Sequence, residues 1–161
     1  MTVVVADTSP INYLILIAEI EILARLFGQV VIPEEVLAEL VDCEAPAEVR
    51  EWMERHPKWV EIKSAPSPDL SLKELDAGEA AAISLAEAET DVLLLIDETA
   101  GRLEASRRGI PNTGTLGVLR RAAIERLVDL PTALERLRAT NFRVSKALLA
   151  ELLTEDAERN R

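Results

Sequence analysis

Cysteine, histidine and aromatic residues are scarce in this sequence. Its 161 residues include one cysteine, one histidine and only 3% aromatic side chains. A single cysteine excludes an internal disulfide and a cysteine zinc cluster, which is typical of a protein from a reducing compartment. So few aromatic residues also argue against a broad platform on which nucleic-acid bases stack. Any metal site in this chain is therefore expected to rely on oxygen ligands.

Long apolar runs and a secretory leader are also missing. No apolar stretch approaches the roughly 20 residues that a membrane-spanning helix requires. The first residues, Met1–Asp7, lack the basic region of a signal peptide and begin as a strand. With 48% hydrophobic residues, the chain is too apolar to remain disordered. We therefore expect one folded, cytoplasmic domain over residues 1–161.

Basic residues are outnumbered, and the imbalance is uneven along the chain. Residues 1–98 contain 21 acidic and 6 basic side chains, whereas residues 99–161 contain 8 acidic and 12 basic ones. One interpretation places a cation site beside an anion-binding rim, because local fields act over about a Debye length of ~8–10 Å. The other interpretation is complementary charge at a self-association surface. Composition leaves both open.

Apolar runs alternate with helical patterns along the chain. Val3–Val5 and Val92–Ile96 are uninterrupted apolar runs, which indicates strands buried on both faces of a sheet. Shorter strands are expected at 30–32, 60–62 and 110–112. Helices are expected at 9–18, 19–27, from 33 onward, and at 45–54, 76–89, 98–108, 115–126, 131–140 and 145–158. The order predicts an α/β fold, a three-layer αβα sandwich around a mostly parallel sheet of about five strands. Its core is expected within residues 2–130, with the helices of residues 131–158 packing on the domain or on a partner.

Two aspartates directly follow the predicted buried strands. Asp7 follows the first strand and Asp97 follows the run at 92–96. In open parallel sheets, ligands bind at the carboxyl ends of the strands. Aspartate is also a common helix N-cap, which gives each residue a structural alternative. Ser9, with Pro10 at the first helical position, and Thr99 are expected to cap these helices instead, which favours a functional role for both aspartates.

Two glutamates occupy unusual positions on predicted helices. Glu79 shares a helical stripe with Ile83, on the face that should pack inward. A carboxylate on a core face is costly unless it is paired or bound to a cation. The spacing of Asp76 and Glu79 equally fits a capping box, in which Glu79 folds back onto the start of its helix. Glu39 lies at the edge of an apolar stripe, from which it can reach a cleft or remain solvated.

Considered together, these acids predict a shared cation site. Like charges that converge repel strongly, and a hard divalent cation relieves the repulsion. Ligation by oxygen alone favours Mg²⁺ or Mn²⁺ over zinc. Such a site suits phosphodiester hydrolysis, in which metal ions activate water and stabilise charge on the phosphate. The four acids concerned are Asp7, Glu39, Glu79 and Asp97.

Five stretches of the chain match one family in the same order. They are Val4–Pro10, Val31–Leu40, Leu75–Ala86, Leu94–Arg102 and Asn112–Leu119. In these stretches the sequence resembles the PIN-domain family of metal-dependent ribonucleases, and most closely its bacterial and archaeal toxin-like branch. The similarity covers about residues 2–130. Each stretch is weakly diagnostic by itself, whereas the ordered set is fairly specific.

The resemblance assigns roles to individual residues. It implies that Asp7, Glu39, Glu79 and Asp97 are the catalytic acids, and that Asp7, Glu79 and Asp97 bind Mg²⁺ or Mn²⁺. The third acid of the wider family is usually aspartate, so Asp76 is a rival for the role of Glu79, and Glu98 is a possible supplement to Asp97. Small polar residues at matching positions, which would orient a water or a phosphate oxygen, are Thr8, Ser9 and Thr115.

The resemblance also implies an activity and partners. It implies an endoribonuclease that hydrolyses RNA phosphodiester bonds, acts as the toxin of a toxin–antitoxin pair, forms a homodimer and is silenced by an antitoxin protein. Arg102, five residues after Asp97, is the best candidate for binding an RNA phosphate, although surface arginines more often form ion pairs. The alternative is a non-catalytic PIN-fold module that binds protein or nucleic acid, which the low basicity and the scarcity of aromatic residues favour.

Overall fold

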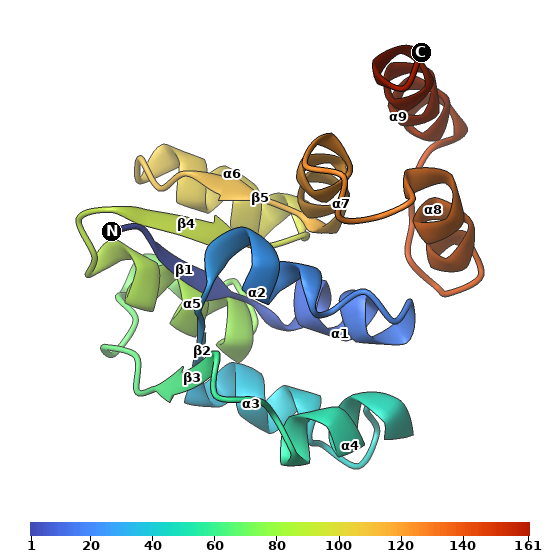
Figure 1. Ribbon diagram of the computed structural model, residues 1–161. Coiled ribbons are helices and arrows are strands. Elements are labelled where there is room, and N and C mark those ends of the chain that lie inside the picture. Colours follow the sequence, from blue (N-terminus) through green and yellow to red (C-terminus); the bar gives the residue numbers. More distant parts are fainter.

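A sheet of five parallel strands forms the centre of the protein, which we describe over residues 1–161 from a computed structural model (Figure 1). The strand order is β3-β2-β1-β4-β5, and every neighbouring pair is parallel. The strands are β1 (Val3–Ala6), β2 (Val30–Pro33), β3 (Val60–Lys63), β4 (Val92–Leu95) and β5 (Asn112–Thr113). The prediction of a largely parallel sheet of about five strands is confirmed.

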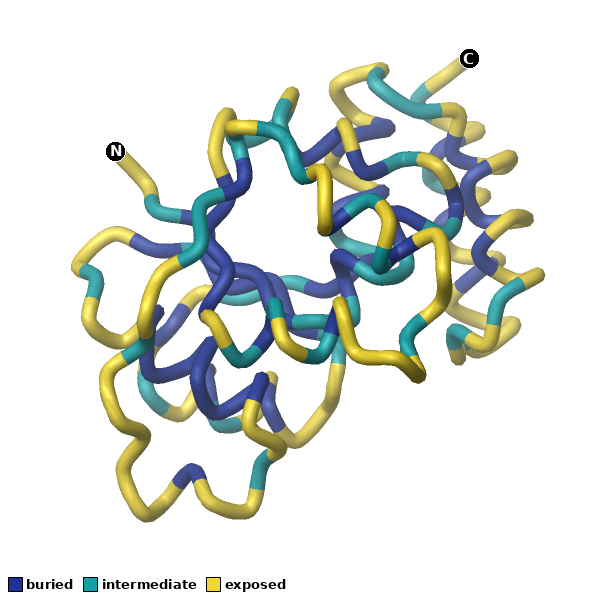
Figure 2. Tube along the Cα trace, turned by 90° about the horizontal axis from the view of Figure 1, so that it is seen from below, coloured by how far each residue is buried: buried dark blue, intermediate teal, exposed yellow.

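The three central strands are buried on both faces. Side chains alternate along β1, so that Val4 packs with Ile32 on one face, while Val5 packs with Leu94 on the other. Figure 2 shows these strands as a buried centre surrounded by exposed loops. Full burial of a valine or isoleucine contributes about 1.5–3 kcal/mol, so uninterrupted apolar runs are stable only in a sheet covered on both sides.

Helices cover both faces and complete the three layers. On one face, α5 (Ala77–Glu87) and α6 (Thr99–Arg107) contribute Ile83 and Ala105 to a core with Val5. A larger core on the other face contains residues of seven helices, of which five pack next to the sheet and contribute, among others, Leu14, Leu23 and Val118. These five helices are α1 (Thr8–Leu16), α2 (Ile22–Phe27), α3 (Glu34–Leu40), α4 (Ala47–Glu54) and α7 (Thr115–Ile124). A short 3-10 turn, η1 (Leu70–Leu72), precedes α5.

The chain ends in two helices that pack beyond α7, far from the N-terminus (Figure 1). Leu134 of α8 (Leu130–Arg138) and Leu149 of α9 (Lys146–Arg159) belong to the same core cluster as α7. The loop between them reaches back to α1, where the Tyr13 hydroxyl donates to Asn141 Oδ1 over 2.6 Å. No helix combines the length and the apolar character needed to cross a membrane.

Two predicted helix caps are wrong. Helix α1 begins at Thr8, with Asp7 at the N-cap position, so Pro10 lies inside the first turn rather than at its start. Ser9 does not cap α1, because it lies inside the first turn of the helix, where its hydroxyl donates to the carboxylate of Asp97 over 2.7 Å. Thr99 does not cap α6 either, since Glu98 occupies that position and forms no capping bond.

The sheet topology brings the two strand-end aspartates to the same edge. Strand β1 lies between β2 and β4, so the chain order reverses at β1. Ala6 is in register with Leu95, and the Asp7 amide donates to the Leu95 carbonyl over 2.9 Å. Asp97 follows two residues later. The crevice beside such a reversal is where open α/β sheets bind ligands.

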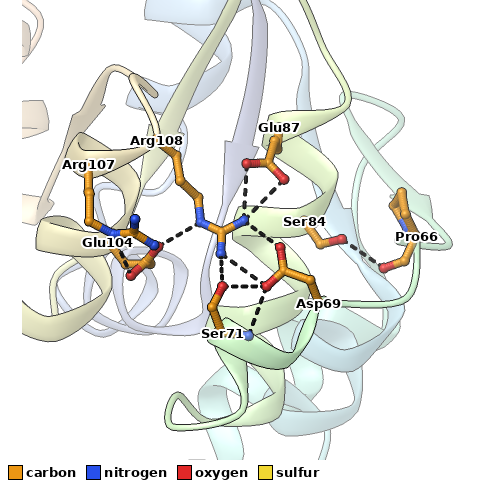
Figure 3. Close-up of polar contacts among 8 residues, drawn as sticks. All are labelled: Pro66, Asp69, Ser71, Ser84, Glu87, Glu104, Arg107 and Arg108. Atoms are coloured by element: carbon orange, nitrogen blue, oxygen red, sulfur yellow. Dashed lines mark hydrogen bonds and ion pairs between the residues drawn. The ribbon is translucent and has the colours of Figure 1, made fainter.

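One arginine fastens the loop that leads into α5 (Figure 3). The Arg108 guanidinium donates to Glu104 on α6, Glu87 on α5, and Asp69 and Ser71 in the loop, over 2.5–3.1 Å. Its side chain is only 9% exposed. The hydrogen bonds from Arg108 hold the pKa of Asp69 well below its usual range. Because the loop continues directly into Asp76 and α5, this cluster fixes the position from which α5 starts.

Replacing Arg108 with alanine should therefore lower the thermal midpoint by about 3–8 °C, because charge-assisted hydrogen bonds are lost from a shielded site. The matched control is Arg107→Ala, since the Arg107 side chain is 65% exposed and pairs only with Glu104. Differential scanning fluorimetry measures both variants, and limited proteolysis reports whether the loop opens. Equal losses in the two variants would contradict the role assigned to Arg108.

Candidate active site

Asp7 is a buried carboxylate with an unsatisfied oxygen. It lies at the end of β1, is 3% exposed, and its Oδ1 atom has no hydrogen-bond partner. Burial raises the pKa of Asp7 to about 7; a hydrogen bond from the Thr8 backbone opposes this shift, and the charges of Asp76, Glu39 and Asp97 add to it. An ionised Asp7 is therefore costly in this structure unless a positive charge is near.

Glu79 is the second buried carboxylate with a free oxygen. It lies in the first turn of α5, is 7% exposed, and its Oε2 atom has no partner. Burial, followed by the neighbouring Asp76 carboxyl, raises the pKa of Glu79. Only half of the possible capping box forms, because Asp76 Oδ1 accepts from the Glu79 amide over 2.8 Å without a return bond. Asp76 therefore caps the helix, while the Glu79 carboxylate lies within the protein.

Glu39 connects the two segments that carry these buried acids. From α3, its carboxylate accepts hydrogen bonds from the Thr8 hydroxyl and, over 3.1 Å, from the Gly78 amide. Thr8 is the neighbour of Asp7, and Gly78 is the neighbour of Glu79. The half-buried Glu39 side chain therefore links the end of β1 to the start of α5.

Asp97 is held by three donors. Its Oδ1 atom accepts from the Thr115 amide, and its Oδ2 atom accepts from the hydroxyls of Thr115 and Ser9, each over 2.7 Å. Thr115 is completely buried at the start of α7. The Asp97 carboxylate is thus fixed between α1 and α7 at the end of β4.

Three glycines provide the space in which these carboxylates lie. A Cβ atom at Gly78 would lie 2.6 Å from Glu39 Oε1, one at Gly101 would lie 2.8 Å from Glu79 Oε2, and one at Gly114 would lie 2.5 Å from Asp97 Oδ1. Any larger side chain would displace an acid. Sequence analysis did not single out these glycines. Each of them nevertheless falls within one of the five stretches that resemble the PIN-domain family, which is the feature from which their role could have been predicted.

The structure brings the predicted acids to one edge of the sheet without assembling a finished metal centre. The pKa of Asp7 responds to Glu39 and Asp97, and that of Glu79 responds to Asp7 and the exposed Glu98. No three carboxylate, imidazole or thiol side chains form a group ready to hold a metal. The donors nevertheless suit a hard cation, because two buried carboxylate oxygens from different elements lack any partner.

Two cavities flank the acids, and their charges differ. One, of about 570 Å³, adjoins Thr8 and Glu39 and is lined by the further acids Glu35, Asp42 and Glu44, with no basic residue. The other, of about 650 Å³, adjoins Ser9 and Asp97. Its lining includes Arg102, as the sequence predicts, and also Arg143, which sequence analysis did not single out. A polyanionic ligand therefore meets positive charge only in the second cavity.

The raised pKa of Asp7 makes stability depend on pH. The pKa of Asp7 is about 7 in the folded protein and 3.8 when the side chain is free in water. As the pH rises from 3.8 to 7, the unfolded chain loses this proton first, so the free energy of unfolding decreases. Asparagine does not titrate, so the Asp7→Asn variant avoids this loss. In chelator, the unfolding free energy of the variant minus that of the natural protein should therefore be about 2–4 kcal/mol larger at about pH 8 than at about pH 4. Denaturant unfolding at both pH values measures this change. An equal difference at the two pH values would show that Asp7 ionises normally in the fold.

Comparison with known proteins agrees with this arrangement. The family model DUF3368, described as a PIN domain, matches residues 3–158. No curated protein and no solved structure gives a significant match. Since this match covers nearly the whole sequence, the chain belongs to the PIN-domain family.

Proposed function

We propose that this protein is a metal-dependent endoribonuclease that hydrolyses phosphodiester bonds of RNA. Its fold is of the nuclease type, as membership of the PIN-domain family indicates. The observation that carries the proposal is the pair of buried, unpartnered oxygens, Asp7 Oδ1 and Glu79 Oε2. Burying two carboxylate oxygens without hydrogen bonds opposes folding, and a divalent cation between strand ends offsets that cost.

Asp7, Glu79 and Asp97 would hold the cation. All three offer carboxylate oxygens, which favour Mg²⁺ or Mn²⁺ over softer metals. When bound, such an ion activates a water molecule and neutralises charge that develops on the phosphate. The raised pKa values of Asp7 and Glu79 imply that loading the site releases protons, so affinity for the cation increases with pH.

The remaining polar residues position these three acids. Ser9 and Thr115 fix the orientation of Asp97 through three hydrogen bonds. Glu39 binds the immediate neighbours of Asp7 and Glu79, and thereby controls the separation of the two buried carboxylates. Mutating residues that orient metal ligands in this way commonly lowers metal affinity or activity by about 10–100-fold.

We therefore expect cleavage of single-stranded RNA in Mg²⁺ or Mn²⁺ and none in excess chelator. Asp7→Asn removes a ligand charge and should lower the cleavage rate at least about a hundredfold. Asp91→Asn is the matched control, because Asp91 is exposed and contacts only Thr2 and the start of β1. Gel analysis of a labelled RNA measures the rates. Cleavage that persists in chelator, or in Asp7→Asn, would eliminate the proposal.

The same assay decides which acid at the start of α5 acts. Glu79→Gln should abolish cleavage, since it neutralises the buried carboxylate with the free oxygen. Asp76→Asn should retain activity within about tenfold, because Asp76 is exposed and asparagine is an equally good N-cap. The reverse order of activities would transfer the ligand role to Asp76.

A more specific role follows from the family branch that the sequence resembles. We propose that the nuclease acts as the toxin of a toxin–antitoxin pair in the cytoplasm, as a homodimer inhibited by an antitoxin protein. The acidic cavity beside Glu39 supports an inhibitor with basic side chains, because four acids and no base line it. These assignments rest on family resemblance and on the charge of that cavity.

One observation favours a second function. The Asp97 and Glu39 carboxylates already accept hydrogen bonds, and no three ligands are preassembled. A PIN-fold module that binds nucleic acid or protein without cleaving it would also tolerate this arrangement. Isothermal calorimetry with Mn²⁺ separates the two functions, since the nuclease must bind the ion and lose that binding in Asp7→Asn.

A further inference from the structure

The cavity beside Asp97 has the composition of a nucleotide-binding site. It is formed by α1, the segment 97–102, the start of α7 and the loop between α8 and α9. Its volume of about 650 Å³ lies within the range of small-ligand sites, about 300–1,000 Å³. Because Asp97 and Ser9 line the cavity, a ligand that fills it reaches the Asp97 end of the acidic site.

Two basic residues line this cavity together with two acidic ones, Asp97 and Glu98. Arg102 and Arg143 both line it, and neither forms an ion pair with a carboxylate. The only side-chain hydrogen bond of Arg102 is a long one of 3.4 Å to Asn112. The first amides of α7, including those of Leu116 and Gly117, also lack partners within the helix. Two unpaired guanidinium groups and a helix N-terminus together suit phosphate oxygens.

Aromatic side chains line the cavity as well. The sequence has only five aromatic residues, and two of them, Tyr13 and Phe142, lie here with their rings 4.9 Å apart at 80°. The Tyr13 hydroxyl donates to Asn141 Oδ1, which leaves the Asn141 amide nitrogen without a hydrogen bond in the protein. Proteins bind unpaired bases with aromatic rings, on which the bases stack, and with polar groups that form hydrogen bonds to the base edges. The scarcity of aromatic residues excludes an extended platform but not a site for one base.

We propose that this cavity binds one nucleotide of a single-stranded RNA, next to the phosphate that the acids cleave. Arg102 and Arg143 bind the backbone phosphate, while Tyr13, Phe142 and Asn141 contact the base. The loop between α8 and α9 therefore contributes to substrate binding, although it lies outside the sheet that carries the acids. This assignment rests on the proposed nuclease function and identifies how its substrate is held.

Binding is tested separately from cleavage. A fluorescein-labelled single-stranded RNA of about eight nucleotides is titrated into the Asp7→Asn protein, and anisotropy gives Kd at several salt concentrations. Adding Arg143→Ala should weaken binding about fivefold and reduce the slope of log Kd against log salt by about 0.7, since one phosphate contact is lost. Arg138→Ala is the matched control, because Arg138 is exposed, has no ion pair and lies outside the cavity. It should change neither quantity.

A second variant tests the contact with the base. Phe142→Leu keeps an apolar side chain against the core and removes the ring, so it should weaken binding at least about fivefold without changing the salt slope. Unchanged thermal midpoints verify that both variants fold. Binding within about twofold of the parent in both variants would overturn the proposed site. Equal affinity for the matching DNA would overturn its assignment to RNA.

Kinetics of the unmodified active site distinguish this proposal from the proposed function. Arg143→Ala and Phe142→Leu should raise KM while kcat stays close to that of the natural protein, because both residues bind substrate without contacting the reacting phosphate. If both variants cleave RNA with an unchanged KM, the proposed nuclease function stands and the proposed nucleotide site is wrong. If RNA binding depends on Phe142 and Arg143 but the natural protein cleaves no RNA, the proposed nucleotide site stands and the proposed nuclease function is wrong.

Discussion

Uncompensated negative charge at the carboxyl edge of the sheet is the constraint on which this structure depends. Asp7 and Glu79 are removed from water, and each keeps one oxygen without a partner. Burying a carboxylate in this way opposes folding, and the raised pKa values of both residues express that cost. The apolar cores on the two faces of the sheet supply the stability that tolerates it.

The arrangement of the acids follows from secondary structure and from a few contacts between distant segments. Parallel strands bring Asp7 and Asp97 to one edge, because β1 and β4 are neighbours in register. Glu39 then joins the neighbour of Asp7 to the neighbour of Glu79, and glycines leave room for the carboxylates. The Arg108 cluster joins the loop before α5 to α6 and to Glu87 at the end of α5 (Figure 3). The placement of Asp7, Glu79 and Asp97 therefore depends on contacts made by residues of other segments.

Much of this arrangement could be predicted from the sequence, and the failures have physical causes. Apolar runs identified the buried strands, and helical periodicity identified Glu79 as an inward-facing acid, because both depend on local patterns. The hydrogen bond from the Ser9 hydroxyl to Asp97 could not be predicted, since the two residues are 88 positions apart in the sequence. The contact between Tyr13 and Asn141, across 128 residues, likewise depends on how the last helices pack on α7. Local patterns cannot encode such contacts.

The uneven charge of the chain has a spatial counterpart around the acids. Arg102 and Arg143, from the basic part of the chain, share a cavity with Asp97, from the acidic part. This arrangement favours a cation site beside an anion-binding rim over charge complementarity between two copies of the protein. The cavity beside Glu39 is lined by four acids and no base, and its field repels a polyanion within about a Debye length of ~8–10 Å. If the protein is the proposed ribonuclease, an RNA strand would therefore approach from the side of Arg102 and Arg143, and its phosphate would reach the acids past Asp97 rather than past Glu39.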